Sequence, residues 1–320
     1  MAAVFRNSND VLTHDNEVLA APSLEDEIHS QAIGKLRNIA DLETRGEFTN
    51  ADSINVFTCC WNPPSIEIKA LLCIVHGYGD HCIRFSGYGE EFAKHGIVCF
   101  SQDLVGFGRS GGVRGPVDNI NNYVRDVIQQ IEMMRGKYLH LPLFIYGHSL
   151  GAAISLSVVL EKQAWFNGLI VSGNNMKAPL KVGRVRRLLL GFAGKVYPSM
   201  TVIAPDLTRL TRDNAEIEKV RQDPLLAKSP IQVKFGVEMF RYLDNMYPRL
   251  NEITLPIFVT HGELDVLCPP ENAVFVYDSV SSRDKSVEVW RGCKHNLQAE
   301  LEPDRSEILS RYVDWILERV

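Results

Sequence analysis

The feature that most constrains this chain is a repeated alternation of short apolar runs with longer stretches of helical periodicity. The runs are rich in β-branched residues and have the length of buried strands. Between two of them, Val124, Val127 and Ile131 recur at the spacing of one helix face. Alternation of this kind predicts an α/β fold with a mostly parallel central sheet and helices on both faces. The predicted strands are 66–75, 97–100, 142–146, 168–171, 257–260 and 287–290.

The alternation fails between residues 173 and 255, where no predicted strand continues the series. A gap of that length is uncommon for a loop in a compact domain and indicates inserted structure of its own. We therefore predict a helical cap at 173–255, inserted into a core formed by 46–172 and 256–320. An N-terminal extension, 1–45, precedes this core.

The N-terminal extension divides into two parts. Residues 1–22 are polar and acidic without sustained periodicity, which predicts disorder. Further along, apolar residues return at helical spacing behind a Ser23 cap, predicting a helix over 23–41. The apolar positions are Leu24, Ile28, Ala32, Leu36 and Ile39.

Composition excludes several other classes of protein. The net charge of −5 comes from the first 50 residues, with nine acidic and four basic side chains, so a nucleic-acid-binding surface is not expected. The seven cysteines lack metal-ligand spacing and predict reduced thiols in the cytoplasm. We expect neither a signal peptide nor a transmembrane helix: the uncharged stretch 138–160 is interrupted by Pro142 and a Gly-containing turn.

Two Gly-x-Ser-x-Gly sequences, centred on Ser110 and Ser149, are candidates for a nucleophile. A nucleophilic serine of this type lies on a sharp turn between a buried strand and a helix. Ser149 fits, because an apolar run precedes it and Gly151-Ala152-Ala153 opens a helical pattern. Ser110 follows a Gly-rich stretch and is predicted to shape the floor of the site.

A serine hydroxyl needs a base within hydrogen-bond reach and a carboxylate that orients the base. In this strand-turn-helix arrangement the partners follow in the order Ser, Asp or Glu, His, each after a strand. His295 comes after the strand at 287–290 and is the predicted base. Asp265 follows the strand at 257–260 and is the predicted carboxylate, with Glu263 as the second choice.

Charge that develops on a carbonyl oxygen requires preorganised donors, which backbone amides supply. One predicted donor is the N–H of Leu150, directly after the nucleophile. The other is the N–H of Tyr78, in the Gly-containing loop His76-Gly77-Tyr78-Gly79-Asp80-His81 that follows an early strand. His76 and His81 are predicted to brace this loop rather than to act as bases.

Taken together, these motifs resemble the monoacylglycerol lipase family of α/β-hydrolases, which includes related lysophospholipases. The resemblance covers about residues 46–319. It rests on the 76–81 loop with Arg84, on Gly106-Phe107-Gly108-Arg109-Ser110, on the turn at Ser149, on Asp223-Pro224 and on Asp265-Val266-Leu267-Cys268.

The resemblance implies an α/β-hydrolase fold and a Ser149, Asp265 and His295 triad. It also implies that Asp80 and Arg84 contact a glycerol headgroup and that Cys268 is a thiol near the catalytic centre, open to modification. Tyr78 stands where the family usually has a small residue, and Asp80 replaces a longer Glu. These departures concern the width of the pocket and the choice of headgroup.

The cap begins with basic and apolar residues mixed at helical spacing, without an acidic residue between Ser172 and Pro205. A basic amphipathic helix of this kind can lie in a lipid interface, so we predict peripheral membrane contact here. The alternative is a lid helix that packs its apolar face on the body. The predicted contact residues are Arg184, Arg186, Arg187, Leu188, Leu189 and Phe192.

The predicted function is hydrolysis of monoacylglycerol to fatty acid and glycerol through an acyl-enzyme on Ser149, without a metal or organic cofactor. A lysophospholipase or general carboxylesterase would use the same triad. Acyl transfer to an alcohol other than water is a further alternative. From another class, the chain could be a catalytically silent ligand-binding protein on this fold. The sequence gives no indication of oligomeric state.

Overall fold

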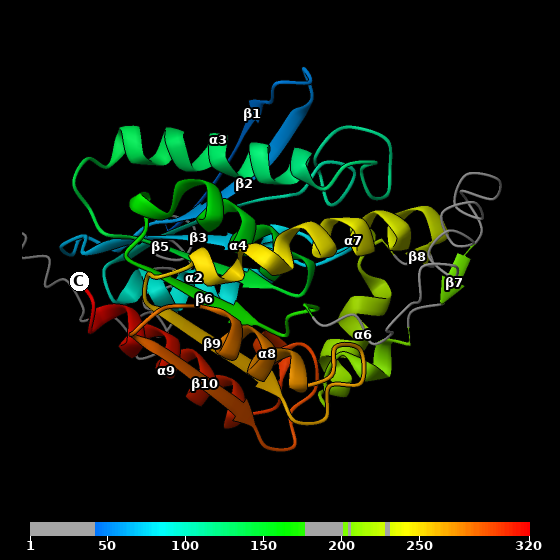
Figure 1. Cartoon of the computed structure of the whole chain (residues 1–320). Coiled ribbons are helices and arrows are strands. Elements are labelled where there is room, and N and C mark those ends of the chain that lie inside the picture. The colour runs from blue at the N-terminus through cyan, green and yellow to red at the C-terminus, as the bar shows by residue number, and fades with distance from the viewer. Residues whose placement is uncertain (1–41, 177–200, 204–205, 228–230) are drawn as a thin grey trace, which may run out of the picture. The chain divides into compact units, whose positions relative to one another are not determined.

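The computed structural model describes residues 42–176, 201–203, 206–227 and 231–320, with an eight-stranded sheet at the centre (Figure 1). The order across the sheet is β1-β2-β4-β3-β5-β6-β9-β10. The strands are β1 (Glu43–Thr49), β2 (Asn55–Trp61), β3 (Ala70–Val75), β4 (Ile97–Gln102), β5 (Leu143–His148), β6 (Gly168–Ser172), β9 (Ile257–Gly262) and β10 (Lys285–Trp290).

The sheet is mostly parallel, as predicted, because only β2 runs antiparallel to its neighbours β1 and β4. All six predicted strands are present, although β3 begins at Ala70 rather than at residue 66. The sequence analysis missed β1 and β2. β1 is mostly exposed and polar, so it carries no apolar run, and it crosses the predicted boundary at residue 46.

Helices cover both faces of the sheet, and alternate strand residues point to opposite cores. In β5, Leu143 and Ile145 belong to the core under α3 (Asn121–Lys137), α4 (Leu150–Lys162) and α8 (Glu271–Ser279). Phe144 and Tyr146 belong to the core under α2 (Ser86–Lys94) and α9 (Asp304–Leu317). Burial on both faces explains why the parallel strands are continuous apolar runs in the sequence.

The insertion between β6 and β9 contains two short strands, two α-helices and two 3-10 helices among its described residues. Its helix α7 packs on the core through Met239, Leu243 and Met246, and Tyr242 donates a hydrogen bond to Ser157 of α4. These elements are β7 (Thr201–Ile203), η3 (Leu207–Arg209), α6 (Asn214–Gln222), β8 (Ile231–Gln232), α7 (Val233–Met246) and η4 (Tyr247–Glu252). The remaining 3-10 helices, in the core, are η1 (Cys82–Phe85), η2 (Gln163–Trp165) and η5 (Leu297–Ala299).

Three predicted features lie outside the described residues: the disorder of 1–22, the helix at 23–41 and the membrane-contact residues between Arg184 and Phe192. Within the described part of the chain, no helix has the length and apolar character needed to cross a membrane. The uncharged stretch 138–160 forms β5 and most of α4.

Helix α2 offers a matched test of core packing. A Cβ added at Gly89 would lie 2.2 Å from the ring of Trp61, which is fully buried, whereas a Cβ at Gly87 of the same helix would meet nothing within 4 Å. We expect Gly89→Ala to lower the free energy of unfolding by about 1–3 kcal/mol through overpacking. Gly87→Ala should be neutral or stabilising by up to about 1 kcal/mol. Urea denaturation of both variants measures this difference, and equal effects would contradict it.

Candidate active site

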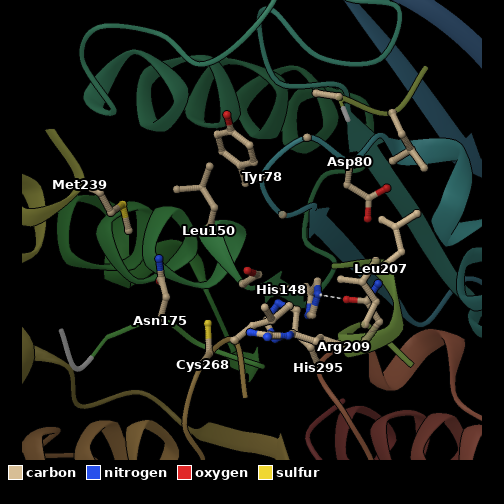
Figure 2. Close-up of a pocket in the computed structure, with 18 of the residues that line it drawn as sticks. Tyr78, Asp80, His148, Leu150, Asn175, Leu207, Arg209, Met239, Cys268 and His295 are labelled. Carbon is tan, nitrogen blue, oxygen red and sulfur yellow. Dashed lines mark hydrogen bonds between the residues drawn. The ribbon is translucent and has the colours of Figure 1, made fainter. Parts of the chain in front are cut away.

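A cavity of about 490 Å³ lies beyond the carboxyl ends of the parallel strands, between the core and the insertion (Figure 2). Ligand sites of open α/β sheets are characteristically found at this edge. The loops after β3, β5, β9 and β10 each contribute to its lining, as do η3 and α7 of the insertion. The residues predicted for the triad, the oxyanion hole, the headgroup contact and the nearby thiol all line it, except Asp265, which lies behind His295.

Ser149 occupies the turn between β5 and α4, with φ of 55° and ψ of −118°. A positive φ is costly for a residue with a side chain and persists only where the surrounding structure enforces it. The flanking glycines allow that packing: a Cβ at Gly151 would lie 2.1 Å from the carbonyl oxygen of Val75, and one at Gly147 would lie 2.4 Å from that of Gly151. The turn thus has the geometry expected for a nucleophile on a strand-turn-helix.

The two predicted oxyanion donors flank this serine. Leu150 is the first residue of α4, where the N–H has no acceptor within the helix and lies at the positive end of the helix dipole. Tyr78 follows Gly77, at which a Cβ would lie only 3.1 Å from the Cβ of Ser149. The loop after β3 therefore passes directly against the serine.

His295 and Asp265 form a hydrogen-bonded pair. The Nδ1–H of His295 donates to Oδ2 of Asp265 at 2.7 Å, so Nε2 is the ring atom left to accept a proton. His295 and Ser149 line the same cavity. Glu263, the second predicted carboxylate, is exposed and accepts a hydrogen bond from the N–H of Gly292 instead.

The Asp265 carboxylate accepts several hydrogen bonds. Its Oδ1 accepts the backbone N–H groups of Leu267 and Cys268, each at 2.9 Å, and its Oδ2 lies 3.0 Å from Nε2 of His261. Burial acts to raise the pKa of Asp265, but the hydrogen bonds from His261 and His295 outweigh it and hold that pKa well below the usual range. Asp265 is therefore ionised at neutral pH.

His261 is a residue of this site for which the sequence analysis assigned no role. It is fully buried at the end of β9, and its Nε2 contacts both Asp265 and the carbonyl oxygen of Cys268, the latter at 2.6 Å. A histidine that ends a strand four residues before the acidic residue was the signal available in the sequence. Sequence alone could not decide whether its ring points into the loop or away from it.

His148 is the second residue to which the sequence analysis gave no function. Its ring centroid lies 4.9 Å from that of His295, and its Nε2–H donates to Oδ1 of Asn296 at 3.0 Å. Burial, together with the neighbouring His295, lowers the pKa of His148 to about 3. The neutral ring of His148 thus packs beside His295, the predicted base, and holds Asn296, the residue directly after His295.

The predicted headgroup residues form an ion pair at the polar side of the cavity. Nε of Arg84 lies 3.0 Å from Oδ1 of Asp80, and both residues line the cavity. His81 does not line it: its Nε2 lies 2.9 Å from Oδ2 of Asp223 in the insertion. His76 braces the loop, since its Nδ1–H donates to the carbonyl of Gly77 and its Nε2 accepts the N–H of Leu104.

The rest of the cavity wall is largely apolar. The ring of Tyr78 packs on Phe107 and on Phe235 of α7, with centroid separations of 5.3 and 4.9 Å. Figure 2 shows Met239, Leu150 and Tyr78 from the left to the upper centre of the view and Asp80 to their right. Further apolar residues of the lining are Leu207, Leu210, Val220, Leu226, Ala227, Phe240, Leu243 and Leu267. Such a wall suits a hydrocarbon chain rather than a charged ligand.

The thiol of Cys268 lines the cavity, and burial raises its pKa well above the usual value, so it is protonated at neutral pH. Among the described residues, Asp265, Cys268 and His295 are close enough to share a metal ion, with ligand atoms within 4.8 Å. Asp265 and His295 already hydrogen-bond to each other. We retain the prediction that no metal is required.

Ser110 does not form the floor of the cavity, which corrects the sequence-based expectation. It is buried between β2 and the loop after β4, where its Oγ donates to the carbonyl of Asp103 at 2.6 Å and accepts the N–H of Phe57 at 2.9 Å. The Gly-x-Ser-x-Gly sequence around Ser110 is therefore a structural turn, which joins β2 to the loop after β4.

Known proteins that are similar to this chain in sequence and in structure agree with one another. The family model described as Serine aminopeptidase, S33 matches residues 66–302. The sequence is 29% identical to monoglyceride lipase of Mus musculus over 272 residues, covering 85% of this chain and 89% of that protein. A soluble variant of monoglyceride lipase from Saccharomyces cerevisiae, solved with a substrate analogue, superposes with a TM-score of 0.76 at 18% identity, covering 86% and 95%. These matches confirm the predicted α/β-hydrolase fold.

The low pKa of His148 makes the stability of the fold dependent on pH. Below its ordinary pKa of 6.5, the unfolded chain binds a proton at His148, whereas the folded chain does not until about pH 3. The free energy of unfolding should fall as the pH is lowered through this window, by up to about 1.4 kcal/mol per pH unit from this group. His148→Gln should flatten that slope between pH 6.5 and 4.

Urea denaturation at a series of pH values measures the slope. The matched control is His95→Gln, since the side chain of His95 is 41% exposed and does not line the cavity. Its slope should equal that of the unsubstituted protein. Identical slopes for His148→Gln and the unsubstituted protein would show that His148 is not held neutral.

Proposed function

The chain belongs to the family described as Serine aminopeptidase, S33, and we propose that it is a serine ester hydrolase that cleaves monoacylglycerol to fatty acid and glycerol. The observation that carries this proposal is the combination of Ser149 on a strained turn with the hydrogen-bonded His295–Asp265 pair at the same cavity. Similarity to monoglyceride lipases over most of the chain supports the choice of substrate.

In the proposed reaction, Nε2 of His295 takes the hydroxyl proton as Oγ of Ser149 bonds to the ester carbonyl carbon. The N–H groups of Tyr78 and Leu150 stabilise the resulting oxyanion. The carbon–oxygen bond to glycerol breaks, and glycerol leaves with the proton from His295. Water then attacks the acyl-enzyme and gives one proton to His295. The bond between the acyl carbon and Oγ breaks, His295 returns the proton to Oγ of Ser149, and the fatty acid is released. Asp265 stays ionised and stabilises the imidazolium throughout.

The two sides of the cavity suit the two parts of this substrate. Tyr78, Phe235 and Met239 offer an apolar wall for the acyl chain. The Asp80–Arg84 pair offers hydrogen-bond acceptors and donors for the glycerol hydroxyls. The ring of Tyr78 takes up space where a smaller residue would leave the pocket wider.

We expect Ser149→Ala to lower kcat for monoacylglycerol by about 10³-fold or more, because the covalent route is lost while the fold remains. Circular dichroism and urea denaturation check that the variant folds. A fluorophosphonate probe should label the unsubstituted protein on Ser149 and leave the variant unlabelled. Absence of labelling on Ser149 in the folded protein would favour a silent ligand-binding protein.

Substrate class is tested with monoacylglycerol, lysophosphatidylcholine, diacylglycerol and a short soluble ester. We expect the highest kcat/KM for monoacylglycerol, because the polar side of the cavity carries a paired charge rather than a free cation for phosphate. Faster turnover of lysophosphatidylcholine would identify a lysophospholipase. Acyl glycerides formed when glycerol is added would reveal acyl transfer to an alcohol.

For the cap, we propose reversible contact of a cytoplasmic enzyme with lipid surfaces through Arg184, Arg186 and Arg187 and the apolar residues among them. Reversing these three charges to Glu should weaken binding to phosphatidylserine-containing vesicles by about tenfold or more, while hydrolysis of a short soluble ester is preserved. The matched control replaces the same three residues with Lys and should bind normally. Equal vesicle binding by the Glu and unsubstituted proteins would exclude this contact.

A further inference from the structure

We propose that Arg212 of the insertion and Glu300 of the core form a positioning pair that holds the loop carrying His295, so that the insertion aligns the general base as well as covering the cavity. This inference rests on the proposed function and goes beyond it, because it gives the insertion a part in the chemical step.

The Glu300 carboxylate lies at the centre of the pair. It is fully buried, five residues after His295. Its Oε1 accepts the backbone N–H of Lys294, the residue directly before His295, at 2.7 Å, and its Oε2 lies 2.7 Å from Nε of Arg212. A buried carboxylate requires a charged or hydrogen-bonding partner, and this one uses its partners to fix the backbone beside the base.

Arg212 belongs to the insertion and lies two residues before the start of α6. Its side chain reaches three groups of the core. Besides Glu300, its guanidinium contacts the carboxylate of Asp304 at the start of α9 and lies 3.4 Å from Sγ of Cys293. Its side chain is 28% exposed, so the pair sits at the edge of the buried region. The planar fork of an arginine suits several acceptors at once, which a lysine would not satisfy equally.

Further hydrogen bonds join the same two segments. The N–H of Asn296 donates to the carbonyl of Leu210 at 2.7 Å, and Oγ1 of Thr211 donates to the carbonyl of Ala299 at 2.5 Å. Nζ of Lys294 donates to the carbonyl of Thr208 at 2.6 Å. His295 therefore lies in a loop whose neighbours on both sides are bonded to residues 208–212.

The same segment also forms part of the cavity wall, since Leu207, Arg209 and Leu210 line it. Different residues of the segment serve the two tasks: Leu207, Arg209 and Leu210 form the wall, whereas Thr211 and Arg212 bond to the residues around the base without lining the cavity. Misplacement of a catalytic group by about 1 Å can cost on the order of a hundredfold in rate. Loss of the pair should therefore lower kcat, with little effect on KM because neither side chain lines the cavity.

The test uses Glu300→Gln and Arg212→Lys in the full chain. We expect each to lower kcat for a short soluble ester by about 10- to 100-fold with KM within twofold, and to slow fluorophosphonate labelling of Ser149 by the same factor. The double variant Glu300→Gln with Arg212→Lys should lose no more than the worse single variant, because the two residues act as one unit. All assays are made where urea denaturation shows full folding.

The matched control is Arg305→Gln, which removes an ion pair between Arg305 and Glu302 on the surface of the same region. It should leave kcat and labelling within twofold. A merely structural pair would lower the free energy of unfolding without changing labelling of the folded protein, and that result would overturn the proposal. If Glu300→Gln does not fold, the labelling rate of Ser149 is measured in Arg212→Lys and Thr211→Val instead. An unchanged labelling rate in both variants would overturn the proposal.

The labelling rate keeps this inference separate from the proposed function. If the protein is labelled on Ser149 but does not hydrolyse monoacylglycerol, the substrate assignment fails while the slower labelling of Arg212→Lys still supports the pair. If Arg212→Lys is labelled at the normal rate while monoacylglycerol is hydrolysed, the pair fails and the function stands.

Discussion

The buried carboxylate of Asp265 is the group on which the arrangement of the site depends. Two backbone N–H groups and two histidine rings surround its oxygens, so the charge is satisfied without water. Those four contacts fold the loop after β9 around the carboxylate and direct Nδ1 of His295 toward it. Because Nδ1 is occupied, Nε2 of His295 is the atom left for proton transfer. The buried charge of Asp265 therefore sets both the tautomer of His295 and the conformation of the loop after β9.

The site also depends on the parallel sheet, because parallel strands end at the same edge. Strands β3, β5, β6 and β9 are successive parallel neighbours, so the loops that carry Tyr78, Ser149 and Asp265 lie at the same edge although they are far apart in the sequence. Close backbone approach then holds Ser149 in its strained conformation, since the glycines on either side allow α4 to reach the end of β3. The strain is maintained by the packing of large apolar strands, which is the most stable part of such a fold.

The insertion adds what the core alone does not provide. Its helix α7 contributes an apolar wall through Phe235 and Met239, and its segment 208–212 contacts the loop of His295 through several hydrogen bonds. Binding of a hydrocarbon chain and support of the base therefore depend on the same inserted segment. In a hydrolase of lipids, this would link occupation of the cavity to the geometry of the chemical step.

The sequence by itself determined the alternation of strands and helices, the turn at Ser149 and the order in which Asp265 and His295 follow, because these are local patterns: apolar periodicity, glycine spacing and strand ends. It could not reveal β1, whose mostly exposed and polar residues form no apolar run, and it also missed the partly buried β2. Nor could it reveal the structural role of Ser110, whose motif is the same as that at Ser149. Only the tertiary structure decided that His261 shares the carboxylate of Asp265, that the ring of His148 packs against that of His295, and that Arg212 reaches Glu300. Each of these contacts joins side chains whose directions depend on how loops pack, and packing is set by the whole fold rather than by neighbours in the chain.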